Sequence, residues 1–458
     1  MGTGRNIERI DPFSGMYQEI AQKRPRAHYL ARYEEIFESF PHIFRELGQQ
    51  ARWEYFAALA NHAFAPANLT DPWAAWGNWV HLASRTAQLT RGLLAYWDQE
   101  RVKFGLREPG LTWRLGQNIA VTPKETIYQS ELLKVYHYLA PEARGNGRPR
   151  GPVHRHPFFM LYSWINAYWI LDLTPETSML ATLRQAGVDT YVTDWQCPRT
   201  REGFRANLDD YLGEVLAAAD AVRRHSGEDR LLIGGYCIGG VLADVLVALD
   251  PERTVALLNL TTGLDTYAGE DGAGAFGAFT SFDIARLGEF AARHGGMLPQ
   301  KAFGEFFDNV KPDKAVQGFV QTYLYGRPES DDPISYWNRR SARPAYPVHL
   351  EFLKRIYNDN ELGDGPMDGS PYPVFGGQEV DLKRITCPLQ VICGRYDHIV
   401  PLPVALRTCH LVGTPPADQE VLLIQGGHVR AIVNLELYPR IAEFLTRHGG
   451  PRDRVPRS

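Results

Sequence analysis

From Lys124 onward, short segments rich in β-branched and aromatic residues alternate with segments of helical periodicity, and this alternation most constrains the fold. Eight segments have the composition of strands: 124–130, 132–140, 157–164, 188–195, 230–237, 255–265, 389–397 and 420–428. Strands that alternate with helices predict an α/β fold, in which helices cover both faces of a mostly parallel sheet. In such sheets the functional loops gather at the carboxyl ends of the strands.

The remaining segments predict two additions to this sheet. Residues 1–115 are expected to form a helical N-terminal region, because apolar residues recur at three- and four-residue intervals between about 26 and 108. Residues 116–458 are expected to form the α/β domain. Between its sixth and seventh strands lies a long insertion, at about 266–383, which begins with a glycine-rich run. We expect this insertion to form a cap over the site.

Composition limits the classes of partner and the cellular compartment that we expect for this chain. The formal net charge of −4 gives no reason to expect a nucleic-acid partner. The five cysteines are odd in number and form no C-x-x-C pair, so neither a disulfide framework nor a metal site is expected. No signal-peptide pattern and no run long enough to span a bilayer is found, which predicts a cytoplasmic setting with free thiols. No cofactor is expected.

The strongest local signal is the run Gly235-Tyr236-Cys237-Ile238-Gly239-Gly240, between an apolar strand and a helical segment. It matches the G-x-S-x-G nucleophile elbow of α/β hydrolases, with cysteine in place of serine. The glycines leave room for a sharp strand-to-helix turn, and the helix N-terminus favours a thiolate. The alternative is that Cys237 is an ordinary buried cysteine beside a glycine turn.

An elbow of this kind predicts an acid and then a histidine further along the chain. Asp397 follows the seventh predicted strand, and His428 follows the eighth. Their order and their positions at strand ends predict a Cys237-His428-Asp397 triad in an α/β-hydrolase fold with an eight-stranded sheet. His398 is adjacent to Asp397, and neighbouring side chains seldom point at each other, so we expect His398 to be structural.

Acyl transfer also needs backbone donors for the oxyanion. The residue after the nucleophile, Ile238, is expected to supply one N–H group. A second should come from the loop that follows the third predicted strand, near Ile165 and Asn166. Both assignments rest on position, because backbone donors leave no side-chain signature.

Together these motifs resemble the polyhydroxyalkanoate synthase family. GGYCIGG at 234–240 is similar to its cysteine-containing box, RYDHIVP at 395–401 to its acid loop, and GGHVRAIVN at 426–434 to its histidine loop. The similarity extends from about Gly116 to Phe444. It implies that Cys237 carries the acyl group or growing chain, that His428 is the general base and that Asp397 orients it.

The resemblance also implies a substrate and partners. Members take (R)-3-hydroxyacyl-CoA thioesters, release CoA and join the acyl units into a polyester. They tend to form homodimers, carry a cap over the site and work at the surface of cytoplasmic storage granules. The chemistry agrees with a cysteine nucleophile, because exchange between a thiol and a CoA thioester is nearly isoenergetic and keeps the acyl group activated.

The sequence departs from the family pattern in its arginines and its short tail. Arg339, Arg340 and Arg343 stand where an acidic and small polar run is usual, and Arg430 replaces a small residue. These arginines either belong to a solvated surface or contact the phosphates of CoA. The chain also lacks the tryptophan-rich tail of longer members. Both differences bear on polymerisation rather than on thioester chemistry.

Three alternative functions follow from the same residues. A thioesterase or single-transfer acyltransferase on CoA or carrier-protein thioesters would use the same triad but end on water, an amine or an alcohol. A non-catalytic scaffold would not need the intact set of Cys237, Asp397 and His428. A serine lipase would need serine at position 237.

Overall fold

The computed structural model describes residues 7–20, 113–139, 153–269, 332–338, 344–364 and 372–451. The predicted helices between 26 and 108 and most of the predicted cap lie outside these ranges, as do Arg339, Arg340 and Arg343. The predicted boundary near 115 and the cap therefore stay predictions.

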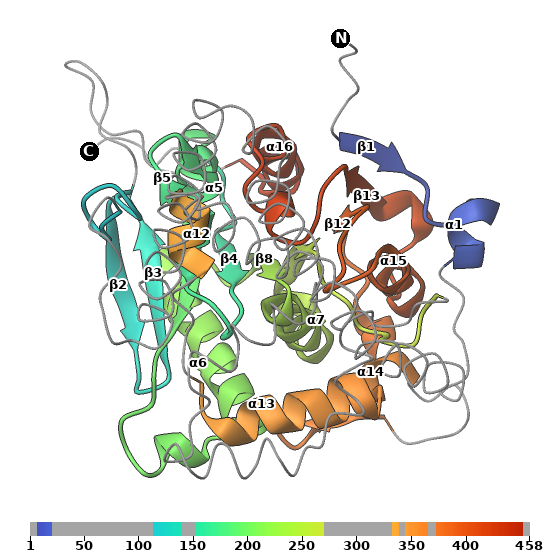
Figure 1. The fold of residues 1–458 in the computed structure, drawn as a ribbon, viewed down its shortest axis with the longest axis horizontal. Coiled ribbons are helices and arrows are strands. Elements are labelled where there is room, and N and C mark those ends of the chain that lie inside the picture. Colours follow the sequence, from blue (N-terminus) through green and yellow to red (C-terminus); the bar gives the residue numbers. More distant parts are fainter. Residues whose placement is uncertain are drawn as a thin grey trace, which may run out of the picture.

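A nine-stranded sheet forms the centre of the molecule (Figure 1). In spatial order its strands are β1 (Ile7–Ile10), β13 (Gln419–Ile424), β12 (Leu389–Gly394), β9 (Thr254–Leu260), β8 (Leu231–Tyr236), β4 (Phe158–Leu161), β7 (Thr190–Trp195), β3 (Leu133–Tyr138) and β2 (Lys124–Gln129). The six strands from β13 to β7 are parallel, whereas β1, β3 and β2 pair antiparallel with their neighbours. All eight predicted strands are confirmed, and so is the fold class.

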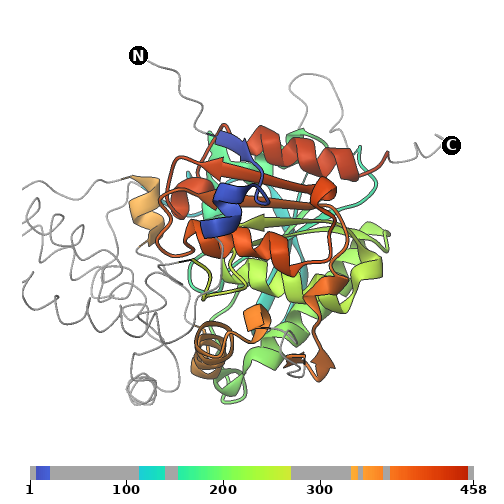
Figure 2. The same cartoon turned by 90° about the vertical axis from the view of Figure 1, so that its right-hand side faces the viewer.

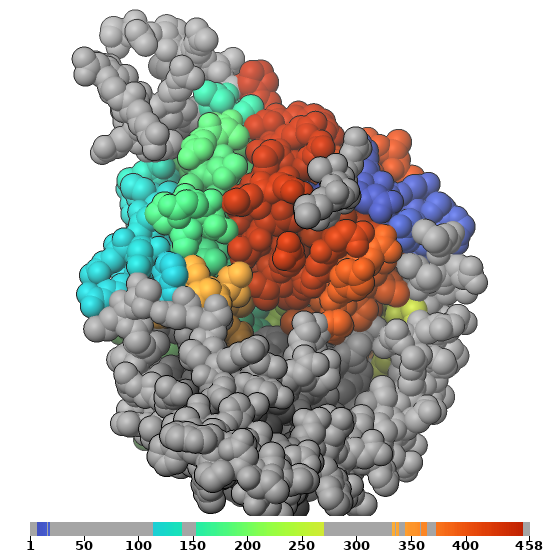
Figure 3. All heavy atoms as spheres, turned by 45° about the horizontal axis from the view of Figure 1, so that its top comes forward, coloured from blue at the N-terminus to red at the C-terminus, as the bar shows by residue number. Residues whose placement is uncertain are grey.

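The ninth strand, β1, was missed by the sequence interpretation. Its four residues, IERI, show no alternation of apolar and polar side chains, and the strand forms by pairing Ile7 to Ile10 with the edge of β13. Arg395 adds an ion pair to Glu8 at 3.5 Å. Figure 3 shows residues 7–20 on the surface beside the C-terminal part of the chain. Because strand formation here depends on a partner more than 400 residues away, no local signal predicts it.

Helices cover both faces of the sheet (Figure 2). On one face pack α6 (Leu208–Ser226), α7 (Ile238–Leu249), α15 (Leu402–Leu411) and α13 (Tyr346–Phe352); on the other pack α5 (Met179–Gln185), α16 (Tyr438–His448) and α12 (Pro333–Asn338). Strand β4 shows the expected period of two, since Phe159 and Leu161 face the first layer while Phe158 and Met160 face the second. All four side chains are fully buried.

The shorter elements complete the described fold. They are α1 (Gly15–Ile20), α14 (Glu361–Asp364), the hairpins β5 (Asp172–Thr174) with β6 (Thr177–Ser178) and β10 (Val374–Phe375) with β11 (Gln378–Glu379), the π-helix η5 (Leu353–Asn358), and the 3-10 helices η1 (Tyr168–Leu171), η2 (Gly203–Arg205), η3 (Pro251–Arg253), η7 (Leu382–Arg384), η8 (Pro416–Asp418) and η9 (Val429–Ala431). Among the helices of the described ranges, none is both long enough and apolar enough to cross a membrane.

A buried polar network joins the two ends of the predicted insertion to the sheet. Asp265, which is fully buried, accepts hydrogen bonds from Arg407 Nε at 3.1 Å and from Asn360 Nδ2 at 3.0 Å. Asn360 Oδ1 in turn accepts from the N–H of Thr266 at 2.9 Å. The segment that leaves β9 and the segment that returns through 344–364 are therefore joined to α15. This network fixes both segments next to the loop that carries Asp397.

A second buried carboxyl lies between α7 and β9. Asp244 is fully buried, and Asn259 Nδ2 donates to its two oxygens at 2.9 and 3.1 Å. Burial raises the pKa of Asp244 to about 8, although the hydrogen bond from Asn259 opposes the rise. In the folded protein this carboxyl is therefore neutral at pH values where an exposed aspartate is ionised.

Replacing Asp244 by asparagine should change how stability depends on pH. The folded pKa of Asp244 is about 8 and its unfolded pKa is 3.8, so unfolding releases a proton between these values. The stability of the wild type then falls as pH rises through this window. Thermal unfolding should show Asp244→Asn gaining Tm relative to wild type as the pH increases from about 5 to 8. Parallel Tm curves for the two proteins would contradict this assignment.

Candidate active site

Cys237 stands at the junction of β8 and α7 in a strained backbone conformation. Its φ and ψ are 54° and −122°, and it is the N-cap residue of α7. A positive φ is uncommon for a residue other than glycine, and such strain persists only where the surroundings enforce it. The sharp turn projects the side chain from the carboxyl end of β8 at the N-terminus of α7. The sulfur is half-buried rather than enclosed.

Close packing explains the glycines around Cys237. A Cβ atom at Gly235 would overlap the backbone of Gly239 and Gly240. At Gly239 it would overlap the carbonyl oxygen of Leu161 at the end of β4, and at Gly240 it would overlap the side chain of Thr262. Each glycine of the motif is therefore required by contact with a neighbouring backbone or strand end.

The end of β9 fixes the turn from the other side. The N–H of Cys237 donates to the carbonyl oxygen of Leu260 at 3.0 Å. Thr262 Oγ1 donates to the same carbonyl at 3.2 Å and lies 3.5 Å from the carbonyl oxygen of Cys237. These contacts leave the backbone at Cys237 little freedom to relax its positive φ.

Asp397 and His428 come together at the carboxyl ends of β12 and β13. His428 Nδ1 lies 2.7 Å from Asp397 Oδ2, and the two residues are 8% and 5% exposed. The other carboxylate oxygen accepts from the N–H groups of Ile399 and Val400 at 2.8 and 2.9 Å. These two bonds orient Asp397, and Asp397 holds the His428 ring so that Nε2 is available to another group.

The environment of His428 favours its protonated form. Burial lowers the pKa of His428, but the Asp397 carboxylate, the nearby Cys237 sulfur and hydrogen bonds to both raise it to about 10. The ring centroid of Tyr236 lies 5.0 Å from the imidazole. The structure therefore brings the three predicted residues Cys237, Asp397 and His428 to one place, with a protonated imidazole facing the sulfur.

All five cysteines are free; Cys393 and Cys409 are buried, whereas Cys197, Cys237 and Cys387 are half-buried. Burial raises the pKa of Cys387 and Cys409 to about 12 and that of Cys393 still further. Such thiols remain protonated and unreactive at neutral pH. Cys197 is half-buried like Cys237, and its sulfur lies 3.6 Å from the carbonyl oxygen of Pro198.

The other predicted residues are placed as follows. His398 is exposed, and it is His428 whose Nδ1 lies against Asp397; the structural role of His398 stays a prediction. Ile238 begins α7 directly after the nucleophile, as an oxyanion donor requires. The N–H of Ile165 donates to Ser163 Oγ at 3.2 Å, so this amide is engaged in a local turn. Asn166 is half-buried in the same loop. The oxyanion assignments stay predictions.

Three tyrosines near the sulfur were not found from the sequence. Tyr162, Tyr236 and Tyr357 are all at least nine-tenths buried. Burial raises the pKa of each hydroxyl. The hydroxyls therefore stay neutral hydrogen-bond donors around the sulfur. Tyr236 adjoins the nucleophile, but Tyr357 is brought there only by the segment that returns from the insertion.

Arg430 lies on the rim of this site. Its side chain is exposed, and its aliphatic part covers Gly426, where an added Cβ would lie 2.9 Å from Arg430 carbons. It follows His428 by two residues in the 3-10 helix η9. The guanidinium is thus directed to solvent beside the loop that carries the histidine.

Comparison with known proteins agrees with this geometry. The alpha/beta hydrolase fold family matches residues 124–434. The chain belongs to this family. The N-terminal region of poly-beta-hydroxybutyrate polymerase (PhaC) matches residues 18–183, which confirms the resemblance found in the motifs.

Three curated relatives share this similarity. A poly(3-hydroxyalkanoate) polymerase of Methylorubrum extorquens is 27% identical over 73% of this chain and 53% of its own length. The poly(3-hydroxyalkanoate) polymerase subunits PhaC of Haloarcula marismortui and Allochromatium vinosum are 27% and 28% identical, over 74% and 71% of this chain and 70% and 88% of their own lengths. The chain thus spans about half the length of the Methylorubrum relative.

Thiol alkylation can test the environment of Cys237. Under native conditions iodoacetamide should modify Cys237 fastest, while the buried Cys393 and Cys409 and the high-pKa thiol of Cys387 react slowly. His428→Gln should slow modification of Cys237 at neutral pH by about tenfold or more, because the imidazolium that favours the thiolate is lost. Peptide mass spectrometry gives the rate at each cysteine, and the rate at Cys197 serves as the internal control. An unchanged rate at Cys237 in His428→Gln would contradict the pairing.

Proposed function

We propose that this protein is an acyltransferase that polymerises (R)-3-hydroxyacyl-CoA thioesters into a polyhydroxyalkanoate with release of CoA. The observation that carries the proposal is the cysteine at the elbow, facing a histidine that is bonded to a buried aspartate. The printed names of the relatives, poly(3-hydroxyalkanoate) polymerase, support the same substrate class. The activity is proposed rather than transferred, because the chain spans only part of the Methylorubrum relative.

Loading begins with the Cys237 thiolate. The sulfur attacks the carbonyl carbon of the CoA thioester, and the resulting oxyanion is held by the N–H of Ile238 and a second donor of the 162–166 loop. The carbon–sulfur bond to CoA then breaks, and the protonated His428 gives its proton to the departing CoA thiolate. The products are an acyl thioester on Cys237, free CoA and a neutral His428.

Elongation uses the neutral histidine as a base. His428 removes the proton from the 3-hydroxyl of an incoming acyl-CoA, whose oxygen attacks the thioester carbonyl on Cys237. The carbon–sulfur bond breaks, an ester forms and the cysteine leaves as a thiolate beside the reprotonated histidine. The lengthened chain, now on CoA, can reload on Cys237. No cofactor besides the CoA of the substrate takes part.

The choice between polymer and free acid depends on which oxygen reaches the thioester. A hydroxyl of a second substrate gives polyester, whereas water gives the 3-hydroxy acid. The names of the relatives, poly(3-hydroxyalkanoate) polymerase, support the first outcome. We further propose a cytoplasmic location at the granule surface and a homodimeric state, both on the resemblance to the synthase family.

Product analysis with (R)-3-hydroxybutyryl-CoA tests the proposal. Wild type should release CoA and form polymer that can be extracted into chloroform. Cys237→Ala should lose CoA release by at least about a thousandfold, and Asp397→Asn by about a hundredfold or more, because the nucleophile is absent or its histidine is misoriented. Cys197→Ala is the matched control and should retain activity. CoA with free 3-hydroxybutyrate in place of polymer would identify a thioesterase instead.

Arg430 should contribute to recognition of the CoA moiety. Removal of a phosphate contact in Arg430→Gln should raise KM for the CoA thioester by about threefold to tenfold with little change in kcat. The corresponding pantetheine thioester, which lacks the nucleotide phosphates, should be used equally well by variant and wild type. Arg440→Gln, an exposed arginine of α16, is the matched control. An unchanged KM for the CoA thioester would assign Arg430 to the solvated surface.

A further inference from the structure

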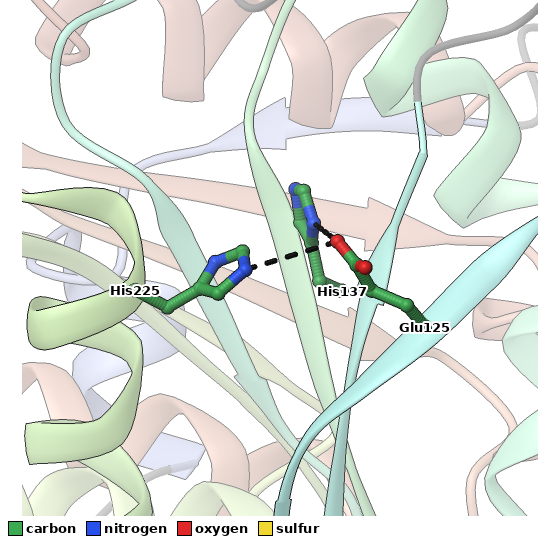
Figure 4. Close-up of side chains that lie close together, drawn as sticks. All are labelled: Glu125, His137 and His225. Carbon is green, nitrogen blue, oxygen red and sulfur yellow. Dashed lines mark hydrogen bonds and ion pairs between the residues drawn. The ribbon is translucent and has the colours of Figure 1, made fainter.

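Two histidines and a glutamate meet at the edge of the sheet, away from Cys237. Glu125 lies on β2, His137 on β3 and His225 in the last turn of α6 (Figure 4). Glu125 Oε1 lies 3.0 Å from His137 Nδ1 and 3.7 Å from His225 Nε2, and one atom from each of the three residues falls within 4.8 Å of the others. The three residues are far apart in the sequence, so no local motif predicts that they form a cluster.

The remaining ring nitrogens are held by further partners. His137 Nε2 lies 2.9 Å from Asp189 Oδ1, and His225 Nδ1 lies 2.9 Å from the hydroxyl of Tyr191. The Tyr191 hydroxyl donates to Asp189 Oδ2 at 3.3 Å, and its oxygen can accept from His225 Nδ1–H. With a proton on His137 Nε2 and on His225 Nδ1, the lone pairs on Nδ1 of His137 and Nε2 of His225 would both face Glu125 and be available to a metal ion. A carboxylate or hydroxyl on the outer nitrogen is the usual support of a metal-binding histidine.

The spacing suits a small tetrahedral cation after a slight contraction. Zinc bonded at about 2.0–2.1 Å places neighbouring ligand atoms about 3.3 Å apart, between the two measured separations from Glu125. His137 is oriented by stacking on Tyr191, with ring centroids 4.6 Å apart at 19°. His225 and Glu125 are exposed, so they can adjust and exchange an ion with solvent.

The charges nearby also allow a divalent cation. Asp189 is neutralised by Arg184, whose Nη1 lies 3.3 Å away, which leaves Glu125 as the carboxylate that faces the two lone pairs.

We propose that Glu125, His137 and His225 form a binding site for a divalent transition metal of the zinc class, with water as the fourth ligand. Asp189 directly precedes β7, and α6 leads into the start of β8, so the cluster lies at the amino ends of these parallel strands. Cys237 follows the carboxyl end of β8. The site is therefore structural: it ties the β2–β3 edge of the sheet to α6 and takes no part in acyl transfer.

Metal titration tests the proposal on the full chain. Cys237→Ala is used as the parent, so that a metal ion cannot bind at the thiol. Zinc binding is followed by calorimetry, and cobalt binding by its visible absorption. The double variants with His225→Gln or Glu125→Gln should bind at least about tenfold more weakly, and so should Tyr191→Phe, which removes the hydroxyl that supports His225 and bonds Asp189. His156→Gln, a half-buried histidine outside the cluster, should bind like the parent.

Stability gives a second measurement that does not depend on activity. Saturating zinc should raise the Tm of the Cys237→Ala parent but leave the His225→Gln double variant unchanged, because only a ligand that prefers the folded state stabilises it. Both glutamine substitutions lie at exposed positions, so the metal-free Tm shows directly whether each variant is folded. No binding by the parent, or equal binding by the parent and the His225→Gln variant, would overturn the proposal.

Discussion

The close approach of α7 to the ends of β4 and β9 is the constraint on which the site depends. Helix α7 can start directly at Cys237 only because Gly239 lies against the carbonyl of Leu161 and Gly240 lies against Thr262. This contact forces Cys237 into its positive φ and directs the sulfur out of the sheet. The hydrogen bond from Cys237 to Leu260 fixes the same turn from the β9 side. The nucleophile is therefore positioned by backbone packing and not by its own side chain.

The parallel sheet supplies the rest of the site from the same end. Strands β12 and β13 are neighbours in register, with Gly394 opposite Ile424, so the loops that follow them start at the same height. The side chains of Asp397 and His428 are thus brought together by the parallel pairing of the two strands. The N–H groups of Ile399 and Val400 fix the orientation of the Asp397 carboxylate. Burial of the pair makes the charge on Asp397 effective, since no solvent screens it, and this raises the pKa of His428.

The sequence predicts what local patterns encode. Eight strands, the elbow glycines, and the order of Cys237, Asp397 and His428 all have local signals, because each strand carries its own residue pattern and each functional residue directly follows a strand. Strand β1 has no such signal, because it exists only by pairing with β13. Tyr357 reaches the sulfur through a chain segment that returns from the insertion, and no pattern within that segment specifies where it packs. The Ile165 amide was assigned by position, whereas its bond to Ser163 depends on the detailed loop conformation.

Burial disfavours the charged form of each ionisable group in this protein, but the outcome differs between sites because the partners of these groups differ. It keeps Asp244 and three of the five cysteines neutral, where neighbouring groups do not offset it. At His428 and His137 the carboxylate partners outweigh the effect of burial, so both imidazoles favour the charged form.

The two histidines nevertheless differ in what faces them. His428 faces a thiol at the carboxyl ends of the strands, where its proton can be passed to a leaving group. His137 faces a glutamate and a second histidine at the amino ends, where we propose the metal site. Because the body of the sheet lies between the two groups, changes at one should leave the chemistry of the other intact.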